Sequence, residues 1–236
     1  MINWAKNLKK QCEFFNRQIH LYLTLRESYS TLLLRKNSVL YDSFFKINLF
    51  IYIFVICLEG GMGKKVALVI SHEGYQPIEY CKTREELENA QIKVVTISDK
   101  INTKIDCFGE LEAETVSMTV KNFLNDDLKG FVGVFLIGGG GALDCLDNED
   151  TYRLMRKVKD AGLYYGAICI SPRILYHAGL IDGKKITGWN GDDKLLEECP
   201  NAHIIDEDIV IDGKLITGRG PHASQAFGRA IVAVVQ

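Results

Sequence analysis

Four nearly uninterrupted apolar runs punctuate the chain after residue 62, and segments of helical or turn character separate them. The runs are residues 65–71, 92–97, 131–137 and 163–168. An apolar run of this length, bounded by turn residues, is typical of a strand buried on both faces of a sheet. Helices are predicted between these strands at residues 77–90 and 148–161. Strands that alternate with helices of this length predict an α/β fold with a mostly parallel central sheet covered on both faces.

The pattern changes after residue 184, where the apolar segments become shorter. Short strands are predicted at 185–188, 203–205, 209–211 and 215–217, and a short helix at 192–199. Asp212-Gly213 predicts a tight turn between the last two strands, hence a C-terminal β-hairpin. A final helix begins at Pro221. Residues 62–236 show no internal repeat and no low-complexity linker, so we expect a single domain there.

Residues 1–61 differ in composition from the rest of the chain. They hold no proline, and their only glycines are Gly60 and Gly61. Their most apolar part, 49–58, is shorter than the ~20 residues that a membrane span needs. Three interpretations stay open: a membrane-associated helical extension, a helical arm that packs on the domain, or a segment outside the natural protein. The bias toward Phe, Ile, Asn, Lys and Tyr resembles translated A/T-rich non-coding DNA. We therefore favour a mis-assigned start, with translation beginning at Met62.

Composition narrows the function classes. The chain carries a net charge of −2, with 47% hydrophobic and 25% charged residues, and no basic stripe with interleaved aromatics. These values are typical of a globular protein and give no argument for nucleic-acid binding. Its seven cysteines include no Cys-x-x-Cys pair. We therefore expect no metal site, no cofactor, and reduced thiols in a cytoplasmic protein without stable membrane insertion.

The most informative stretch is 162–176, where a buried strand turns sharply into a helix. Ser171 and Pro172 predict an N-cap and a proline in the first helical turn, two and three residues after Cys169. Cys169 then lies at the carboxyl end of a strand and the N-terminus of a helix. Such a nucleophile elbow exposes the side chain and strains the backbone. The helix N-terminus is expected to favour the reactive thiolate. A plain buried cysteine is the alternative interpretation.

Other segments converge on this edge of the sheet, where sites of open α/β sheets lie. Glycines 138–141 allow close backbone approach, so the N–H groups of Gly139 and Ile170 are candidate oxyanion donors beside Cys169. Glu79, in the first turn of the first helix, is a candidate carboxyl partner, although acids there are common for structural reasons. Further pocket candidates are His72, Gly138, Trp189 and His222.

Residues 65–234 resemble the DJ-1/PfpI superfamily, which is class I glutamine-amidotransferase-like. The matching pieces are Val66-Ala67-Leu68-Val69-Ile70, Ile78-Glu79, Phe135-Leu136-Ile137-Gly138-Gly139-Gly140, Gly166-Ala167-Ile168-Cys169 with Pro172, and Thr217-Gly218-Arg219-Gly220-Pro221. The resemblance implies a flavodoxin-like three-layer sandwich, Cys169 as the nucleophile and Glu79 as its carboxyl partner. It also implies the Gly139 and Ile170 amides as oxyanion donors, and a homodimer.

One departure from the family pattern decides between activities. PfpI-type relatives carry a histidine directly after the nucleophile, where this chain has Ile170. Amide hydrolysis needs an acid for its leaving group, so a peptidase or amidase is the least favoured function. We favour a cysteine-dependent enzyme acting on small reactive carbonyls, of the glyoxalase or deglycase type. The alternative is a redox-sensing stress-response protein or chaperone in which Cys169 is reversibly oxidised.

Overall fold

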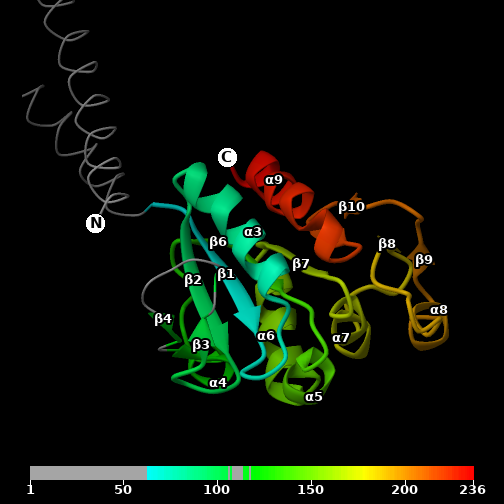
Figure 1. Cartoon of the computed structure of the whole chain (residues 1–236), viewed down its shortest axis with the longest axis horizontal. Coiled ribbons are helices and arrows are strands. Elements are labelled where there is room, and N and C mark those ends of the chain that lie inside the picture. The colour runs from blue at the N-terminus through cyan, green and yellow to red at the C-terminus, as the bar shows by residue number, and fades with distance from the viewer. Residues whose placement is uncertain (1–62, 106, 108–113, 117) are drawn as a thin grey trace, which may run out of the picture. The chain divides into compact units, whose positions relative to one another are not determined.

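The computed structural model describes residues 63–105, 107, 114–116 and 118–236, and the expectations for residues 1–61 lie outside them. Its main sheet has seven strands in the order β10-β11-β7-β6-β1-β2-β5, all parallel except β10. The predicted α/β class with a mostly parallel sheet is confirmed (Figure 1).

The strands of the main sheet follow the apolar runs closely. They are β1 (Lys65–Ile70), β2 (Lys93–Ser98), β5 (Met118–Thr119), β6 (Phe131–Leu136), β7 (Tyr164–Ile168), β10 (Ile209–Asp212) and β11 (Leu215–Gly218). The central strands β1, β6 and β7 are almost wholly buried, as their continuous apolar sequence predicts. The antiparallel pair β10–β11 is the predicted hairpin, with Asp212 opposite Leu215. Two further two-stranded sheets pair β3 (Lys104–Ile105) with β4 (Glu114–Thr115), and β8 (Lys185–Ile186) with β9 (His203–Ile204).

Helices cover both faces of the sheet and make two separate cores (Figure 1). On one face lie α3 (Pro77–Asn89) and α9 (Ser224–Val235), which follows the 3₁₀ turn η1 (Pro221–Ala223). On the other face lie α4 (Val120–Leu124), α5 (Ala142–Leu146), α6 (Glu149–Asp160) and α7 (Pro172–His177). A short α8 (Leu195–Glu198) follows β8. Burial on both faces explains why sequence alternation is absent from the central strands.

Two details of the helices differ from the sequence expectation. The apolar pattern of the predicted helix 77–90 puts Ile78 on its inward side, but Ile78 is 41% exposed, whereas its neighbours Glu79 and Tyr80 are fully buried. The buried face of α3 therefore carries polar residues, including Thr83, as well as Leu87. The five-residue helix α5 was not predicted, because its sequence is too short to show a helical period.

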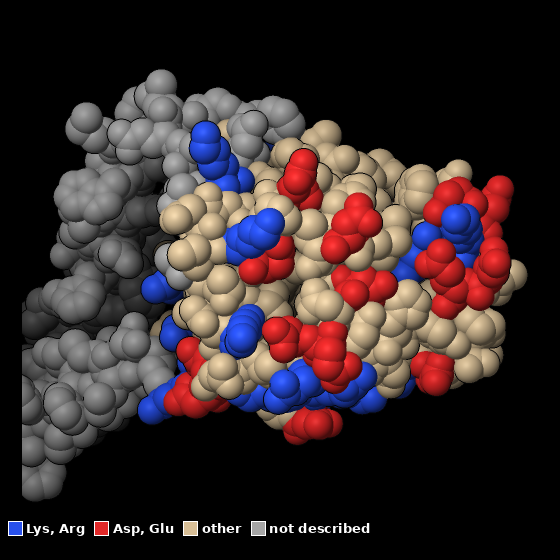
Figure 2. Space-filling view, turned by 90° about the horizontal axis from the view of Figure 1, so that it is seen from below, with Lys and Arg blue, Asp and Glu red and all other residues tan. Residues whose placement is uncertain are grey.

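The surface carries both signs of charge. Lys and Arg side chains are interspersed with Asp and Glu over the face shown in Figure 2. In the described part of the chain, no helix is long and apolar enough to cross a bilayer.

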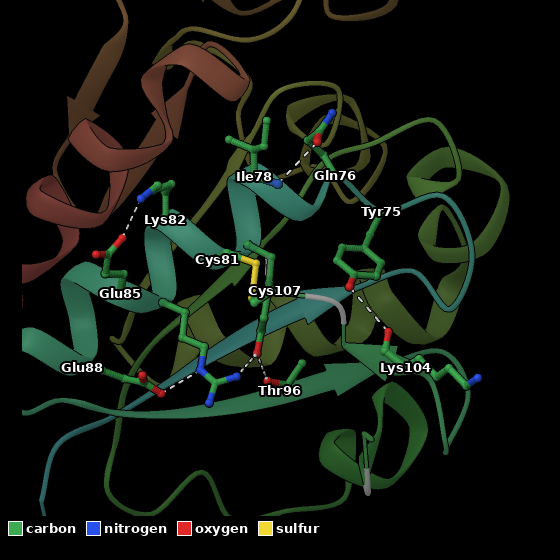
Figure 3. Close-up of a disulfide and its surroundings, with 12 residues drawn as sticks. Tyr75, Gln76, Ile78, Cys81, Lys82, Glu85, Glu88, Thr96, Lys104 and Cys107 are labelled. Atoms are coloured by element: carbon green, nitrogen blue, oxygen red, sulfur yellow. Dashed lines mark hydrogen bonds and ion pairs between the residues drawn. A yellow bond between two sulfur atoms is a disulfide. The ribbon is translucent and has the colours of Figure 1, made fainter. Parts of the chain in front are cut away.

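A disulfide joins Cys81 in α3 to Cys107, which follows β3 (Figure 3). The expectation that all cysteines are reduced thiols is therefore wrong for these two residues. Their Cα atoms lie 5.6 Å apart although 26 positions separate them in the sequence. Spacing cannot reveal such a pair, because the fold brings a helix and a strand end together. Among the described residues, Cys145, Cys169 and Cys199 are free thiols.

Candidate functional site

Cys169 lies directly after β7, on the predicted sharp turn into α7. Its φ angle is +65°, in the left-handed region that non-glycine residues rarely adopt. Two backbone bonds hold this conformation: the Cys169 N–H donates to Gly218 O at 2.9 Å, and the Trp189 N–H donates to Cys169 O at 2.7 Å. The backbone strain expected at the elbow is thus present, but the expected exposure of the side chain is not, because Cys169 is only 8% exposed.

Ser171 has a different role from the predicted one. It adopts helical angles and makes no side-chain cap. Its hydroxyl instead donates to the carbonyl of Ile137 at 2.8 Å, just beyond the end of β6. Ser171 therefore ties the elbow to the neighbouring strand end, and the first turn of α7 remains uncapped by a side chain.

Glu79 enters the same site from the first turn of α3 and is completely buried. Its Oε2 accepts a hydrogen bond from the Gly138 N–H at 2.9 Å. Oε1 is also buried and has no N–H or O–H partner among the described residues. Burial raises the pKa of Glu79 to about 7, and hydrogen bonds from Cys169 and from the Gly138 amide only partly oppose that rise. Near neutral pH this carboxyl can therefore both hold and release a proton.

Gly138 makes the contact between Glu79 and Cys169 sterically feasible. A Cβ at this position would lie 2.5 Å from the Cys169 Cβ and 2.8 Å from Glu79 Oε2. Gly139 has a φ of +115°, and a Cβ there would lie 2.3 Å from the carbonyl oxygen of Gly74. Both glycines are required because backbone and side chains approach closer than any other residue would permit.

Three of the groups that the sequence named adjoin the sulfur of Cys169: the Glu79 carboxyl and the amides of Ile170 and Gly139. Burial is the main cause that raises the pKa of Cys169 to about 12, and the charge of Glu79 adds to it. Hydrogen bonds from the Ile170 and Gly139 amides act in the opposite direction. The expected thiolate, stabilised by the helix N-terminus, is therefore not the form that this site favours. A six-residue helix cannot offset burial beside a carboxylate.

The candidate histidines are engaged elsewhere. His72 binds Asp99 through Nδ1 at 2.6 Å, and His222 binds Asp208 through Nε2 at 3.0 Å. His177, the last residue of α7, binds Asp147. No hydrogen bond joins a histidine to Cys169 within the described ranges, so Glu79 is the titratable group that adjoins the sulfur.

Trp189 is brought to the elbow by its backbone, while its side chain is 37% exposed. The loop that carries it is anchored by Arg173, a residue that the sequence reasoning missed. The guanidinium of Arg173 is buried and pairs with Asp192 and Glu198. An arginine directly after the elbow proline was the available signal, since a buried arginine needs acidic partners.

Residues 64–234 match the model of the DJ-1/PfpI family. An uncharacterized protein of Staphylococcus aureus is 33% identical over 181 residues, which are 74% of this chain and 100% of that protein. An uncharacterized protein of Methanocaldococcus jannaschii is 30% identical over 182 residues, covering 75% of this chain and 85% of the relative.

Solved structures agree on the fold. A ThiJ/PfpI domain protein from Brachyspira murdochii superposes with a TM-score of 0.64 at 24% identity, covering 73% of this chain and 97% of its own. Drosophila melanogaster DJ-1beta superposes with a TM-score of 0.63 at 23% identity, covering 73% and 90%. At these identities the likeness establishes the shared fold alone.

Proposed function

Because the chain belongs to the DJ-1/PfpI family, we propose that it is a cysteine-dependent enzyme that converts small reactive carbonyls, 2-oxoaldehydes in particular, to 2-hydroxy acids. One observation carries this proposal: a buried cysteine adjoins a buried carboxyl whose pKa is raised to about 7. A carboxyl of this pKa is suited to exchange protons in both directions at neutral pH.

The first half of the reaction attaches the substrate. Above pH 7 the Glu79 carboxylate takes the proton from the Cys169 thiol as sulfur attacks the aldehyde carbon. A C–S bond forms, the carbonyl π bond opens, and the protonated Glu79 returns the proton to the new alkoxide. The product is a hemithioacetal, and no leaving group has departed.

The second half of the reaction rearranges the hemithioacetal and releases the product. Glu79 removes the proton from the former aldehyde carbon while the adjacent ketone oxygen takes up a proton, which gives an enediol. Glu79 then returns its proton to the adjacent carbon as the hydroxyl on the sulfur-bearing carbon gives up its own, and a 2-hydroxy thioester results. Water then attacks the thioester carbonyl, the C–S bond breaks, and sulfur recovers its proton. The sum is one 2-oxoaldehyde plus one water giving one 2-hydroxy acid, so the sequence needs no outside oxidant or reductant.

Backbone amides are the proposed electrostatic support. The N–H groups of Gly139 and Ile170 already lower the pKa of the Cys169 thiol, so they lie within reach of negative charge at this sulfur. We propose that they shift from sulfur to the substrate oxygen once the C–S bond has formed.

Aldehyde addition also explains why the site works without a histidine. Amide hydrolysis must protonate a departing amine, and Ile170 occupies the position from which relatives would do so. Addition to an aldehyde expels no amine. The mixed charge of the face in Figure 2 likewise supports a small substrate rather than a nucleic acid.

The decisive test is methylglyoxal consumption and lactate formation without added glutathione. We expect turnover by the parent, whose kcat/KM rises with an apparent pKa near 7. Cys169→Ser should lose activity by on the order of 10³-fold or more, and Glu79→Gln by about 10²- to 10⁴-fold. Cys145→Ser is the matched control and should retain activity. Absence of turnover by the parent would overturn the proposal.

A second candidate function is redox sensing by Cys169, favoured by the unpartnered Oε1 of Glu79. Two equivalents of peroxide would convert the thiol to a sulfinic acid and yield two waters. A protonated Glu79 could then donate to a sulfinate oxygen. Peroxide should oxidise Cys169 ahead of Cys145 and Cys199, and peptide mass mapping would detect the difference. Equal oxidation of the three residues would contradict sensing at Cys169.

We propose the cytoplasm as the location and a homodimer as the assembly. The Cys81–Cys107 disulfide weighs against a permanently reducing compartment. Alkylation of free thiols in intact cells before lysis would show whether this pair is oxidised in place.

Light scattering on the purified full chain would give the assembly directly, and a monomer mass would contradict the dimer.

A further inference from the structure

A second group of chemistry-bearing side chains lies at the same edge of the sheet. His72 follows β1, Asp99 follows β2, and Cys145 belongs to α5. One ligand atom from each of the three lies within 4.8 Å of the others. Because β1 and β2 are parallel neighbours with Ile70 opposite Ser98, the residues just beyond them emerge side by side.

This cluster is distinct from the Cys169 site. Cys169 follows β7, and the strand order places β6 and β1 between β7 and β2. None of the three cluster residues appears among the groups that influence the pKa of Cys169 or Glu79. The cluster therefore needs its own explanation.

The carboxylate of Asp99 is oriented before any ligand arrives. Its Oδ1 accepts the backbone N–H of His72 at 2.7 Å, and its Oδ2 lies 2.6 Å from the ring Nδ1. The hydroxyl of Ser98 donates to the carboxylate at 3.2 Å. Ordering of this kind reduces the cost of assembling a metal site, since ligand orientation is set by surrounding hydrogen bonds.

The other ring nitrogen of His72 meets an exposed cation. Lys100 Nζ lies 2.8 Å from Nε2. Nδ1, on the other side of the ring, lies 2.6 Å from Oδ2 of Asp99, so an ion that takes the place of a proton between them would contact both atoms. A neutral imidazole is the ligating form of histidine. Lys100 is on the surface, and its flexible side chain can turn into solvent.

We propose that His72, Asp99 and Cys145 bind one divalent ion of the zinc class. The donors are an imidazole nitrogen, a carboxylate oxygen and a thiolate sulfur. Sulfur disfavours Mg²⁺ and Ca²⁺, which take oxygen ligands, and the mixed set suits Zn²⁺ or its spectroscopic substitute Co²⁺.

The number of protein ligands determines how the ion is coordinated. Three protein ligands leave the fourth tetrahedral position to water or to a small ligand. A surface hollow of about 310 Å³, lined by His72 and by residues 100–104, adjoins the cluster and provides access for both. Binding displaces the thiol proton of Cys145, so the two anionic ligands neutralise the ion and one or more protons are released.

The test is titration of the reduced full chain with Co²⁺, followed by thiolate-to-cobalt charge-transfer absorption in the near ultraviolet. We expect one equivalent of Co²⁺, displaced by Zn²⁺. Cys145→Ser should abolish the charge-transfer band, and His72→Gln should weaken Co²⁺ binding by at least about 100-fold. Cys169→Ser and Cys199→Ser are matched controls and should keep the band.

Two outcomes would overturn the proposal. One is no charge-transfer band with the parent protein. The other is a band that survives Cys145→Ser and disappears with Cys169→Ser, which would place the metal at the Glu79 pair. Cys145→Ser replaces one sulfur by oxygen at a half-buried position. Thermal unfolding of the metal-free variant should therefore match that of the parent, which excludes loss of the fold as the cause.

Discussion

Cys169 and Cys145 lie at the same edge of the sheet, but they have opposite kinds of surroundings. Cys169 has a left-handed backbone conformation and is buried beside the carboxyl of Glu79, which is buried as well. Cys145 is half-buried in the short helix α5, close to Asp99 and to His72, which lines a solvent-accessible hollow. A dry acid–thiol pair is suited to proton transfer, whereas an open set of mixed donors is suited to an ion.

The largest expected effect separates the two sites by their response to pH. The pKa of Glu79 is about 7 in the folded protein, against 4.5 for the unfolded chain. As pH rises, the unfolded chain therefore loses this proton before the folded protein does. The contribution of protonated Glu79 to the free energy of unfolding is complete below pH 4.5. It declines as pH rises and is lost above pH 7, a change of about 3 kcal/mol in the free energy of unfolding.

Urea unfolding between pH 4 and 8 checks this difference. Glu79→Gln should flatten the pH dependence, whereas Asp99→Asn, its counterpart in the cluster, should leave the decline caused by Glu79 in place. An unchanged decline in Glu79→Gln would show that another group is responsible.

The disulfide belongs to the Cys169 side of this comparison, since Cys81 lies two residues after Glu79 in α3. The paired Cys81→Ala, Cys107→Ala variant should lose about 3 kcal/mol of unfolding free energy by the chain-entropy argument. Carbonyl turnover should fall with it, while Co²⁺ binding at the cluster should persist. Equal stability of the variant and the oxidised parent would contradict the structural role of the disulfide.

A single added methyl group should be enough to disturb the Cys169 site. Gly138→Ala places a Cβ against both Cys169 and Glu79, and misplacement of reacting groups by about 1 Å costs on the order of 10²-fold in rate. Gly140→Ala is the matched control, because a Cβ there meets nothing within 4 Å. Comparable activity of the two variants in the methylglyoxal assay would contradict the proposed geometry.

These contrasts mark what the sequence could predict. The elbow at Cys169 was predictable because its signals are local: an apolar run, then Ser171 and Pro172. The confirmed sheet and hairpin follow from the same kind of pattern. The pKa direction of Cys169 was not predictable, because it depends on burial depth rather than on the helix that follows.

The cluster and the disulfide escaped prediction for a related reason. His72, Asp99 and Cys145 come from three segments, and their approach depends on the pairing of β1 with β2. Cys81 and Cys107 likewise meet only through the fold. Apolar periodicity predicts which residues are buried, but it does not give the register of non-local strands.

The smallest expected effect reverses sign between the two cysteines. At Cys169 the left-handed backbone penalises any residue with a Cβ, so Cys169→Gly should unfold with a free energy about 1 kcal/mol higher than Cys169→Ala. At Cys145, inside α5, helix propensity favours alanine, so Cys145→Gly should be about 1 kcal/mol less stable than Cys145→Ala. Urea unfolding of the four variants at pH 4, where the Glu79 charge is absent, measures both differences. The same sign at both positions would mean that the elbow stores no backbone strain.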